Sequence, residues 1–548
     1  MSEIRPTPAQ SGAFFRQTLP WLIVLVQLAW WSYGTWPISP VEGDEQGVLF
    51  GAEGMLRHDP LLLRVRYLYQ VQPGSYQLLV ALARATHGSL ETIFGVATVV
   101  GAVGFALTSA YLLRILLGWP LAWVLVGLLG CQELTTAACY MNTSALAGGL
   151  AILGVVLAGR SPRPGWLYAG LALAVAGWLR ADSLLVAPAC LGMTYWARRE
   201  WRPALIHTTA TAVTAVLAVL LLYRASGTSL LTGFNSYTER GMALSGWRTL
   251  IETSLLLLSP ALAVCAALGC GLMLWRRQYA LGLVVMGGVG PSVLAYGTSL
   301  TTPKYFYYLV PFALAPALVA LEGLLQSLQQ RPAWQRRLAW CLGLAFLAGD
   351  TVVGLRTLSD EQRYFTTAPT WARLGPLRRG AKTFALVLGP GELVLNADGF
   401  RLRTGQGFAP WCWHVEKIRM RHELATIARW LEQEKDFTLL WSNWIPYQMV
   451  SREMFAAGYR PEDPPQIGTG MAYPGNWQRG EHHVHLDFLG YVNNTYQPPG
   501  PSKTVQAGTV TFFVGDCARQ PITELLDGRQ WQLVSAVPEG FMTLHQRR

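Results

Sequence analysis

Charged residues are scarce in this chain. Asp, Glu, Lys and Arg together make up 14% of its 548 residues, whereas 51% are hydrophobic. Average proteins contain about 25% charged residues, so an ordinary soluble enzyme of this length is excluded. Acidic residues are fewer than basic residues, and the formal net charge is +11. Much of the Lys and Arg lies in short tracts between apolar runs, where membrane proteins keep their cytoplasmic anchors, so we do not predict nucleic-acid binding.

Cysteine is also scarce, with eight residues and no metal-ligand spacing. Most lie in or beside apolar runs, where small buried thiols are common. Cys412 and Cys517 fall in the polar C-terminal part, where an oxidising compartment would let them pair; two separate thiols are the alternative. The motif "EHHVH" would place His483 and His485 on one face of a strand, but no third ligand lies nearby and a solvated loop is favoured. No cofactor is indicated, and dependence on a divalent metal stays open.

Long apolar runs are abundant instead. A span across a hydrocarbon core needs about 20 mostly apolar residues in helical form, and about eleven segments meet this requirement. No small-residue cleavage site follows the first segment, so we expect it to be a retained span. The predicted spans are residues 18–37, 92–113, 120–138, 144–159, 165–179, 183–197, 203–223, 249–275, 279–300, 305–326 and 338–356.

The short loops between these spans predict the orientation. With a cytoplasmic N-terminus, most of their arginines lie inside and few lie outside, as the positive-inside rule requires. An odd number of spans then places everything after about residue 357 outside the cytoplasm. We expect a multi-pass protein of the inner (plasma) membrane. The inside arginines are Arg5, Arg16, Arg114, Arg160, Arg163, Arg198, Arg199, Arg202, Arg276, Arg277, Arg331, Arg336 and Arg337.

Two regions lie outside the apolar spans. Residues 38–91 contain "QPGSYQLLVALARATHG", which predicts a Pro-initiated amphipathic helix at the membrane interface. Residues 357–548 are more polar: "HELATIARWLEQEKD" has helical periodicity, and "TFALVLG", "FTLLWS", "TVTFFVG" and "WQLVSAV" are typical of short strands. The predicted fold is a polytopic α-helical membrane protein of about 11 transmembrane helices. Its predicted domains are the membrane part, residues 1–356, and a C-terminal extracytoplasmic α/β domain, residues 357–548.

An acidic stretch follows the first apolar run. "SPVEGDEQGVLF", residues 39–50, places Glu42, Asp44, Glu45 and Gln46 in the first outer loop. Its composition alone is that of a solvated loop just outside a transmembrane helix. A functional interpretation needs further residues on the same side of the membrane.

Such residues are present, and their order resembles the C-type integral-membrane glycosyltransferases, in the branch of protein O-mannosyltransferases and aminoarabinose transferases. Members carry an acidic pair in the first outer loop, here Asp44 and Glu45 of "GDE". A Pro-led, aromatic-rich amphipathic segment follows, here "YLYQVQPGSYQLLVALARATHG". "YMNTSALAGGLAIL", "GWLRADSLLVAPA" and "TPKYFYYLVPFALAPAL" are similar to later family segments. The likeness covers residues 18–326 in order and topology.

The sequence also departs from this family. The usual double Pro is "QPG", Gln72 stands where a Lys often precedes the Pro, and Asn142 stands where many members have an Asp. These departures affect the phosphate-binding set and any metal role, but not Asp44.

The resemblance implies transfer of a sugar from a polyprenyl-phosphate donor to a hydroxyl-bearing lipid, glycan or protein acceptor at the outer face, in contact with membrane lipids. Asp44 is the predicted base, because a carboxylate can take the acceptor's proton as the sugar C1 is attacked, and Glu45 would orient acceptor or base. The leaving phosphate needs fixed cations or donors. The predicted phosphate ligands are Arg66, Arg180, Lys304, Tyr67 and Tyr305, and the predicted substrate contacts are Glu133, Asn142 and Gln72. Interfacial anchoring and helix capping are the alternatives for these residues.

Two other classes of protein stay open. A polytopic transporter or lipid flippase usually has internal repeats and ionisable residues near the bilayer midplane. The ionisable residues of the predicted spans fall nearer the span ends, and no repeat is evident. A membrane-anchored binding protein that uses only its outer domain does not explain so many spans.

Overall fold

A computed structural model describes most of the membrane part of the chain and several strands after it. Cys412 and Cys517 lie outside its described residues, as does the helix predicted at 422–436. The described residues are 18–35, 43–58, 69–129, 131, 141–160, 165–231, 260–296, 307–329, 331–335, 338, 385–387, 392–394, 437–441, 454–462, 476–488, 491–492, 495–496, 510–514, 531–536 and 543–547.

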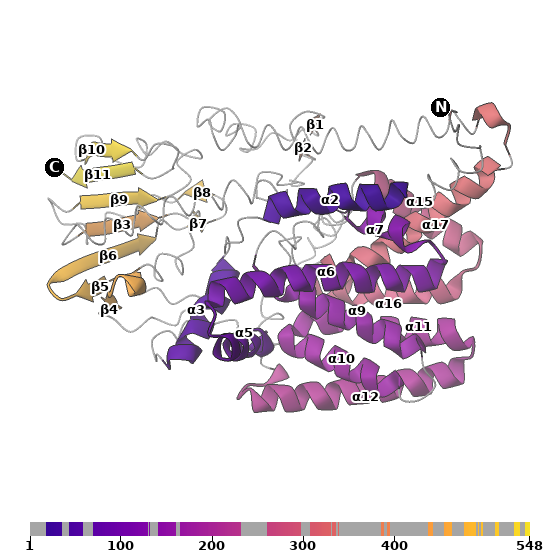
Figure 1. Cartoon of the computed structure of the whole chain (residues 1–548), viewed down its shortest axis with the longest axis horizontal. Helices are drawn as coiled ribbons and strands as arrows, with labels where there is room; N and C mark the ends of the chain where they lie inside the picture. Colours follow the sequence, from indigo (N-terminus) through magenta and orange to yellow (C-terminus); the bar gives the residue numbers. More distant parts are fainter. Residues whose placement is uncertain are drawn as a thin grey trace, which may run out of the picture.

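The described part is mostly helical, and most of its helices lie side by side in a bundle (Figure 1). A helix lies within each predicted span up to residue 326, whereas the span predicted at 338–356 lies almost wholly outside the described residues. The helices are α2 (Leu19–Thr35), α3 (Gly43–Arg57), α5 (Pro73–Thr86), α6 (Leu90–Leu117), α7 (Leu121–Leu129), α9 (Ser144–Arg160), α10 (Gly165–Leu179), η1 (Ala181–Val186), α11 (Ala189–Arg198), α12 (Trp201–Ala225), α15 (Pro260–Trp275), α16 (Tyr279–Tyr296), η3 (Tyr307–Leu309) and α17 (Val310–Gln329).

Three described helices are long and apolar enough to cross a membrane: Leu90–Leu117, Trp201–Ala225 and Val310–Leu328. The middle one, α12, is little buried and exposes a band of large apolar side chains. An apolar face without a protein partner fits contact with lipid chains. The helices are those of a multi-pass membrane protein. The exposed apolar residues of α12 are Leu205, Ile206, Val213, Val216, Leu217, Leu220 and Leu221.

Local sequence signals explain several helix ends. Pro73 is the first residue of α5, as predicted, and its missing N–H costs nothing there. Ser89 caps α6 by accepting the N–H of Thr92 at 3.2 Å. The span predicted at 183–197 is not one helix, because η1 ends at Val186 and α11 begins at Ala189. Pro188 lies between them, and its ring and lack of an N–H interrupt a continuous helix.

The main hydrophobic core lies between α6, α7, α9, α10, α11, α16 and α17. Small residues let these helices approach closely. A Cβ on Gly101 of α6 would lie 2.7 Å from the backbone nitrogen of Leu146 in α9, so only glycine fits there. This close contact fixes the start of α9 relative to α6, and the start of α9 carries Asn142 and Ser144.

Helix α3 was not predicted, because four glycines within "GDEQGVLFGAEGMLR" lower its helix propensity. Packing compensates for this. Val48, Leu49 and Ala52 are buried in a second hydrophobic cluster with α5, the start of α6 and Met141. Residues Gly43–Gln46 of the acidic stretch thus form the first turn of a helix, and the residues that follow them, Gly47–Phe50, are buried.

The C-terminal region contains strands at all four predicted sites, in β1, β3, β9 and β10. Its main sheet has the order β10-β11-β9-β3-β6-β5-β4, with β3 parallel to β6 and β9 and the other pairs antiparallel. Its α/β character stays a prediction. The strands are β1 (Ala385–Val387), β2 (Glu392–Val394), β3 (Phe437–Trp441), β4 (Arg460–Pro461), β5 (Asn476–Arg479), β6 (His482–Phe488), β7 (Tyr491–Val492), β8 (Thr495–Tyr496), β9 (Val510–Val514), β10 (Trp531–Ala536) and β11 (Thr543–Arg547).

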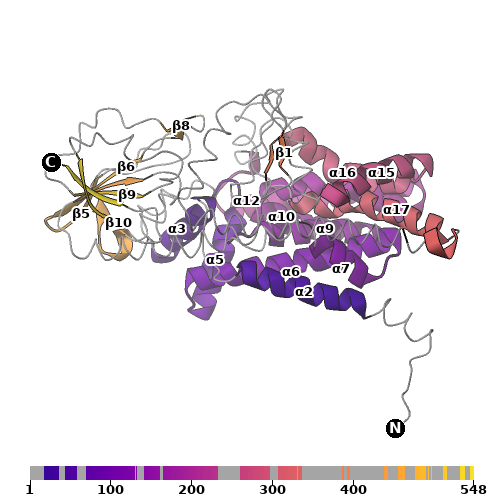
Figure 2. The same ribbon diagram turned by 90° about the horizontal axis from the view of Figure 1, so that it is seen from above.

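The strands of the main sheet lie beyond the end of the helical bundle that carries α3 and α5, as Figures 1 and 2 both show. The starts of α5 and α9 and the end of α10 meet at this same end of the bundle, because Ser75, Thr143 and Leu179 are hydrogen-bonded to one another. The candidate site is built here.

Candidate functional site

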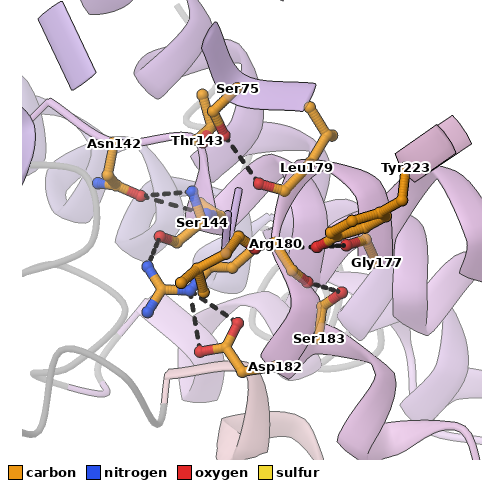
Figure 3. Close-up of polar contacts among 12 residues, drawn as sticks. Ser75, Asn142, Thr143, Ser144, Gly177, Leu179, Arg180, Asp182, Ser183 and Tyr223 are labelled. Atoms are coloured by element: carbon orange, nitrogen blue, oxygen red, sulfur yellow. Dashed lines mark hydrogen bonds and ion pairs between the residues drawn. The ribbon is translucent and has the colours of Figure 1, made fainter. Parts of the chain in front are cut away.

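Three chain segments meet at the candidate site, and each leads into a helix (Figure 3). Gln72 precedes α5, Asn142 precedes α9, and Arg180 precedes η1. The two α-helices present the positive ends of their dipoles at these starts. The sequence places these three residues far apart, and the fold brings their segments together.

Arg180 is held in one orientation by two other side chains. Its Nε donates to both carboxylate oxygens of Asp182, at 2.7 and 2.9 Å, and its Nη1 donates to the hydroxyl of Ser144 (Figure 3). The Arg180 side chain is 12% exposed and that of Asp182 is 1% exposed. In a buried pair of this kind, the attraction between the two charges offsets their desolvation free energy only while both partners are present.

Asp182 was not predicted as a site residue. The sequence places it near a span end, two residues after an arginine, which is also the pattern of a solvated helix end. Its burial depends on α9 and η1 packing around it, which no local pattern reports. The quoted segment "GWLRADSLLVAPA" contained the only available signal, an Arg and an Asp close together in an apolar context.

Asn142 has the capping role that the sequence left as an alternative to a sugar contact. Its Oδ1 accepts the N–H groups of Ser144 at 3.0 Å and Ala145 at 3.2 Å, at the start of α9. Its own N–H donates to the Thr98 hydroxyl at 2.8 Å. Asn142 therefore orients the first turn of α9, including the Ser144 hydroxyl that contacts Arg180.

The "QPGS" segment is fixed from three directions. The Ser75 hydroxyl donates to the carbonyl oxygen of Leu179 at 2.8 Å and is also hydrogen-bonded to Thr143. The Val71 carbonyl oxygen accepts from the Ala181 N–H at 3.1 Å and from the Tyr223 hydroxyl at 3.1 Å. These bonds tie the start of α5 to α9, η1 and α12.

Gly74 explains why this segment contains a glycine. A Cβ at this position would lie 2.6 Å from Cδ2 of Trp178 and 2.7 Å from its carbonyl oxygen. Only glycine lets α5 approach the end of α10 this closely.

Gln72 is the N-cap residue of α5, and its side chain is buried, with the residue 8% exposed. Its side chain makes no capping hydrogen bond to the described first turn of α5. The position that often carries a Lys in the resembling family therefore holds a neutral amide beside a helix start.

Asp44 and Glu45 lie in the first turn of α3, whose later residues pack on α5 and beside Met141. The fold thus brings the acidic turn to the same end of the bundle as Gln72, Asn142 and Arg180. The structure describes the backbone of the two acids and not their side chains. Successive helix positions are about 100° apart, so the two acids occupy different faces of α3.

Five predicted site residues lie outside the described residues, and their roles stay predictions. They are Arg66, Tyr67, Glu133, Lys304 and Tyr305.

The four residues His482–His485 of the histidine motif lie in a strand, β6, so the favoured prediction of a solvated loop was wrong. His483 Nδ1 lies 2.6 Å from a carboxylate oxygen of Glu462, and both side chains are partly exposed. The described residues contain no group of three or more His, Cys, Asp or Glu that could hold a metal ion. His483 and Glu462 are thus hydrogen-bonded to each other.

Comparison with known proteins identifies the fold. No family model and no curated protein matches the chain. Among solved structures, ArnT from Cupriavidus metallidurans in the apo state has a TM-score of 0.51 at 13% sequence identity, covering 95% of this chain and 97% of that chain. The same protein bound to undecaprenyl phosphate has a TM-score of 0.48 at 13% identity, covering 96% and 98%. The chain therefore has the fold of ArnT.

Proposed function

We propose that this protein is a membrane glycosyltransferase that moves a sugar from a polyprenyl-phosphate donor to a hydroxyl-bearing acceptor at the outer face of the membrane. One observation carries the proposal: in a chain with the ArnT fold, the acidic turn of α3, the starts of α5 and α9, and the fixed Arg180 guanidinium meet at one end of the bundle. This end offers both a base and donors for a phosphate.

The base is Asp44, as the family motif implies. A hydroxyl acceptor is a poor nucleophile at neutral pH, and a carboxylate in hydrogen-bond reach takes its proton while the sugar C1 is attacked. Glu45 lies on another face of α3, so its role is to orient the acceptor or Asp44 rather than to share the proton.

The phosphate leaves with growing negative charge, which fixed donors stabilise without reorganising. Arg180 is fixed by Asp182 and Ser144, so its position is preorganised. Because Asp182 neutralises its charge, the contribution of Arg180 is directional hydrogen bonding more than net attraction. The start of α5 and the Gln72 amide add neutral donors at the same place.

The opposite end of the bundle supports the orientation. Arg160 ends α9, Arg198 ends α11 and Arg276 follows α15, all at exposed or half-buried positions. They lie at the ends of the helices that are remote from the candidate site, because α9 begins at the site and ends at Arg160. This distribution agrees with a cytoplasmic face there and an outer face at the site.

The structure does not favour the transporter alternative. Arg180 and Asp182 are buried and ionisable, but Arg180 lies between α10 and η1 and Asp182 lies in the first turn of η1, at a helix end. A polyprenyl-phosphate sugar suits this place, because its lipid can remain in the bilayer while its phosphate and sugar reach the bundle end. The acceptor class, lipid, glycan or protein, stays open.

The test is sugar transfer by purified protein in nanodiscs, with polyprenyl-phosphate sugars as donors. Asp44→Asn should lower turnover by about 10²-fold to 10⁴-fold, as loss of a general base typically does, with donor binding retained. Glu53→Gln is the matched control on the same helix, since Glu53 pairs with Arg57 two turns beyond the acidic pair. It should keep wild-type turnover. At least half of wild-type turnover in Asp44→Asn would reject Asp44 as the base.

A further inference from the structure

The acidic helix α3 is contacted from outside the bundle by a small C-terminal unit, which we call the docking lobe: residues 454–462 together with 476–484. The Phe455 ring packs on the Phe50 ring of α3, with ring centroids 5.4 Å apart and an angle of 58° between the planes. Phe50 is 2% exposed. Phe455, in the helical turn at 454–456, thus packs on α3 from the C-terminal region.

The docking lobe is built to hold Phe455 rigidly. Trp477, 1% exposed, meets the Phe455 ring edge-on, with centroids 5.1 Å apart, and the Arg460 guanidinium lies 5.0 Å from the centre of the same ring. Such ring contacts stabilise a fold beyond the effect of their buried area. They fix the orientation of the Phe455 ring that packs on α3.

The backbone of the docking lobe is equally constrained. The turn after Phe455 closes through the Tyr459 N–H and the Met454 carbonyl oxygen at 2.9 Å, with Gly458 at φ +87°. The Arg479 side chain donates to the Ala457 carbonyl oxygen at 2.8 Å and lies over the Tyr459 ring. Strands β4, β5 and β6 pair in register around this turn.

Helix α3 is consequently clamped on two sides. On the inner side Val48, Leu49 and Ala52 pack on α5 and α6, and the Tyr76 hydroxyl reaches the Gly47 carbonyl oxygen at 3.4 Å. On the outer side the docking lobe holds Phe50. The helix needs both contacts, because its glycines give it little intrinsic stability.

We propose that Phe455 is a positioning residue: the docking lobe sets the position of α3, and thereby of the acidic turn at its start. Phe50 lies six residues after Asp44, which is about 9 Å along a helix, so a shift at Phe50 moves the acidic turn as part of the same rigid element. Displacement of a catalytic group by about 1 Å can cost about 10²-fold in rate. The effect on catalysis rests on the proposed function, whereas the contact that holds α3 in place does not depend on it.

The experiment compares the full-length protein in nanodiscs with Phe455→Ala, Phe455→Tyr and Gln478→Ala. Phe455→Tyr keeps the ring, and Gln478→Ala changes an exposed residue of the docking lobe that does not contact Phe50. Two quantities are measured: hydrogen exchange of α3 and α5 amides, and kcat and KM for a polyprenyl-phosphate sugar.

Phe455→Ala should speed exchange in residues 47–52 by roughly 2-fold to 10-fold, the range that corresponds to losing one aromatic contact, and leave α5 unchanged. It should lower kcat by about 10-fold or more without raising the donor KM, because the base is misplaced while the phosphate site is intact. Phe455→Tyr and Gln478→Ala should match the wild type in both.

Unchanged exchange in α3 would overturn the clamp. Faster exchange in α3 with an unchanged kcat would overturn the positioning role. If the wild-type protein transfers no sugar with any donor, the proposed function fails, and the exchange data alone then decide whether the docking lobe holds α3.

Discussion

The two ends of the helical bundle use arginine in opposite ways. At the site end, Arg180 is 12% exposed and is held by Asp182 and Ser144. At the other end, the Arg160 guanidinium lies over the Tyr111 ring and that of Arg199 over the Trp196 ring, both at exposed helix ends. A buried, fixed arginine costs desolvation free energy that an exposed anchor does not. The difference indicates that the site end holds the Arg180 guanidinium in a fixed position even though its burial lowers the free energy of unfolding.

The largest effect is expected when the charge of Arg180 is removed. Arg180→Gln removes the cation that pairs with the buried Asp182 carboxylate, and breaking a buried ion pair in this way typically costs about 3–5 kcal/mol of folding free energy. If Arg180 also contacts the donor phosphate, apparent donor affinity should fall by about 10-fold to 100-fold, the worth of one charge-assisted hydrogen bond. Thermal unfolding and donor titration measure the two effects separately.

The matched control for Arg180→Gln is the double variant Arg180→Gln with Asp182→Asn, which removes both charges and leaves no orphan ion. It should recover most of the lost stability while donor affinity stays low. Arg180→Lys adds a second check, because an ammonium does not reproduce the fixed guanidinium geometry. A stable double variant with wild-type donor affinity would show that Arg180 is only a structural residue.

A smaller effect is expected at Gln72, where the site end carries a buried neutral amide. Gln72→Lys places a cation beside the start of α5, so the apo protein should lose stability through desolvation. Donor phosphate should restore it, and the donor-induced rise in melting temperature should exceed that of the wild type. Gln72→Met is the neutral control of similar length. An equal donor-induced rise in Gln72→Lys and Gln72→Met would place the phosphate elsewhere.

The sequence was sufficient for those parts of the fold that local signals dictate. Pro73 marked the start of α5, and apolar runs marked the helices of the bundle. It did not predict α3, whose glycine-rich sequence becomes helical only through contacts with α5 and Phe455. Nor did it predict that Pro188 divides one expected span.

The site was predictable only in part, for the same reason. Arg180 and Asn142 were identified as candidates from motifs near span ends, and both lie at the site. Asp182 was missed, because its burial is produced by segments that are distant in the sequence. Capping by Asn142 was one of two open alternatives. Its hydrogen bonds to Thr98 of α6 and Ser144 of α9 depend on how these helices pack, which the sequence does not show.

The smallest effect is expected at the opposite end of the bundle, in Arg199→Gln. Arg199 is exposed and follows α11 at φ +58°, with its guanidinium 4.4 Å from the centre of the Trp196 ring. Loss of this exposed cation–π contact should cost about 0.5–1 kcal/mol of stability. Sugar transfer should change less than about twofold, because general-base and phosphate chemistry takes place at the other end. Arg199→Lys keeps the cation and should match the wild type in stability. The measurement is thermal unfolding and steady-state transfer in nanodiscs, run beside Arg180→Gln. If Arg199→Gln lowered donor affinity as much as Arg180→Gln, the two ends would not differ in function, and the assignment of the site to the α3 end would be wrong.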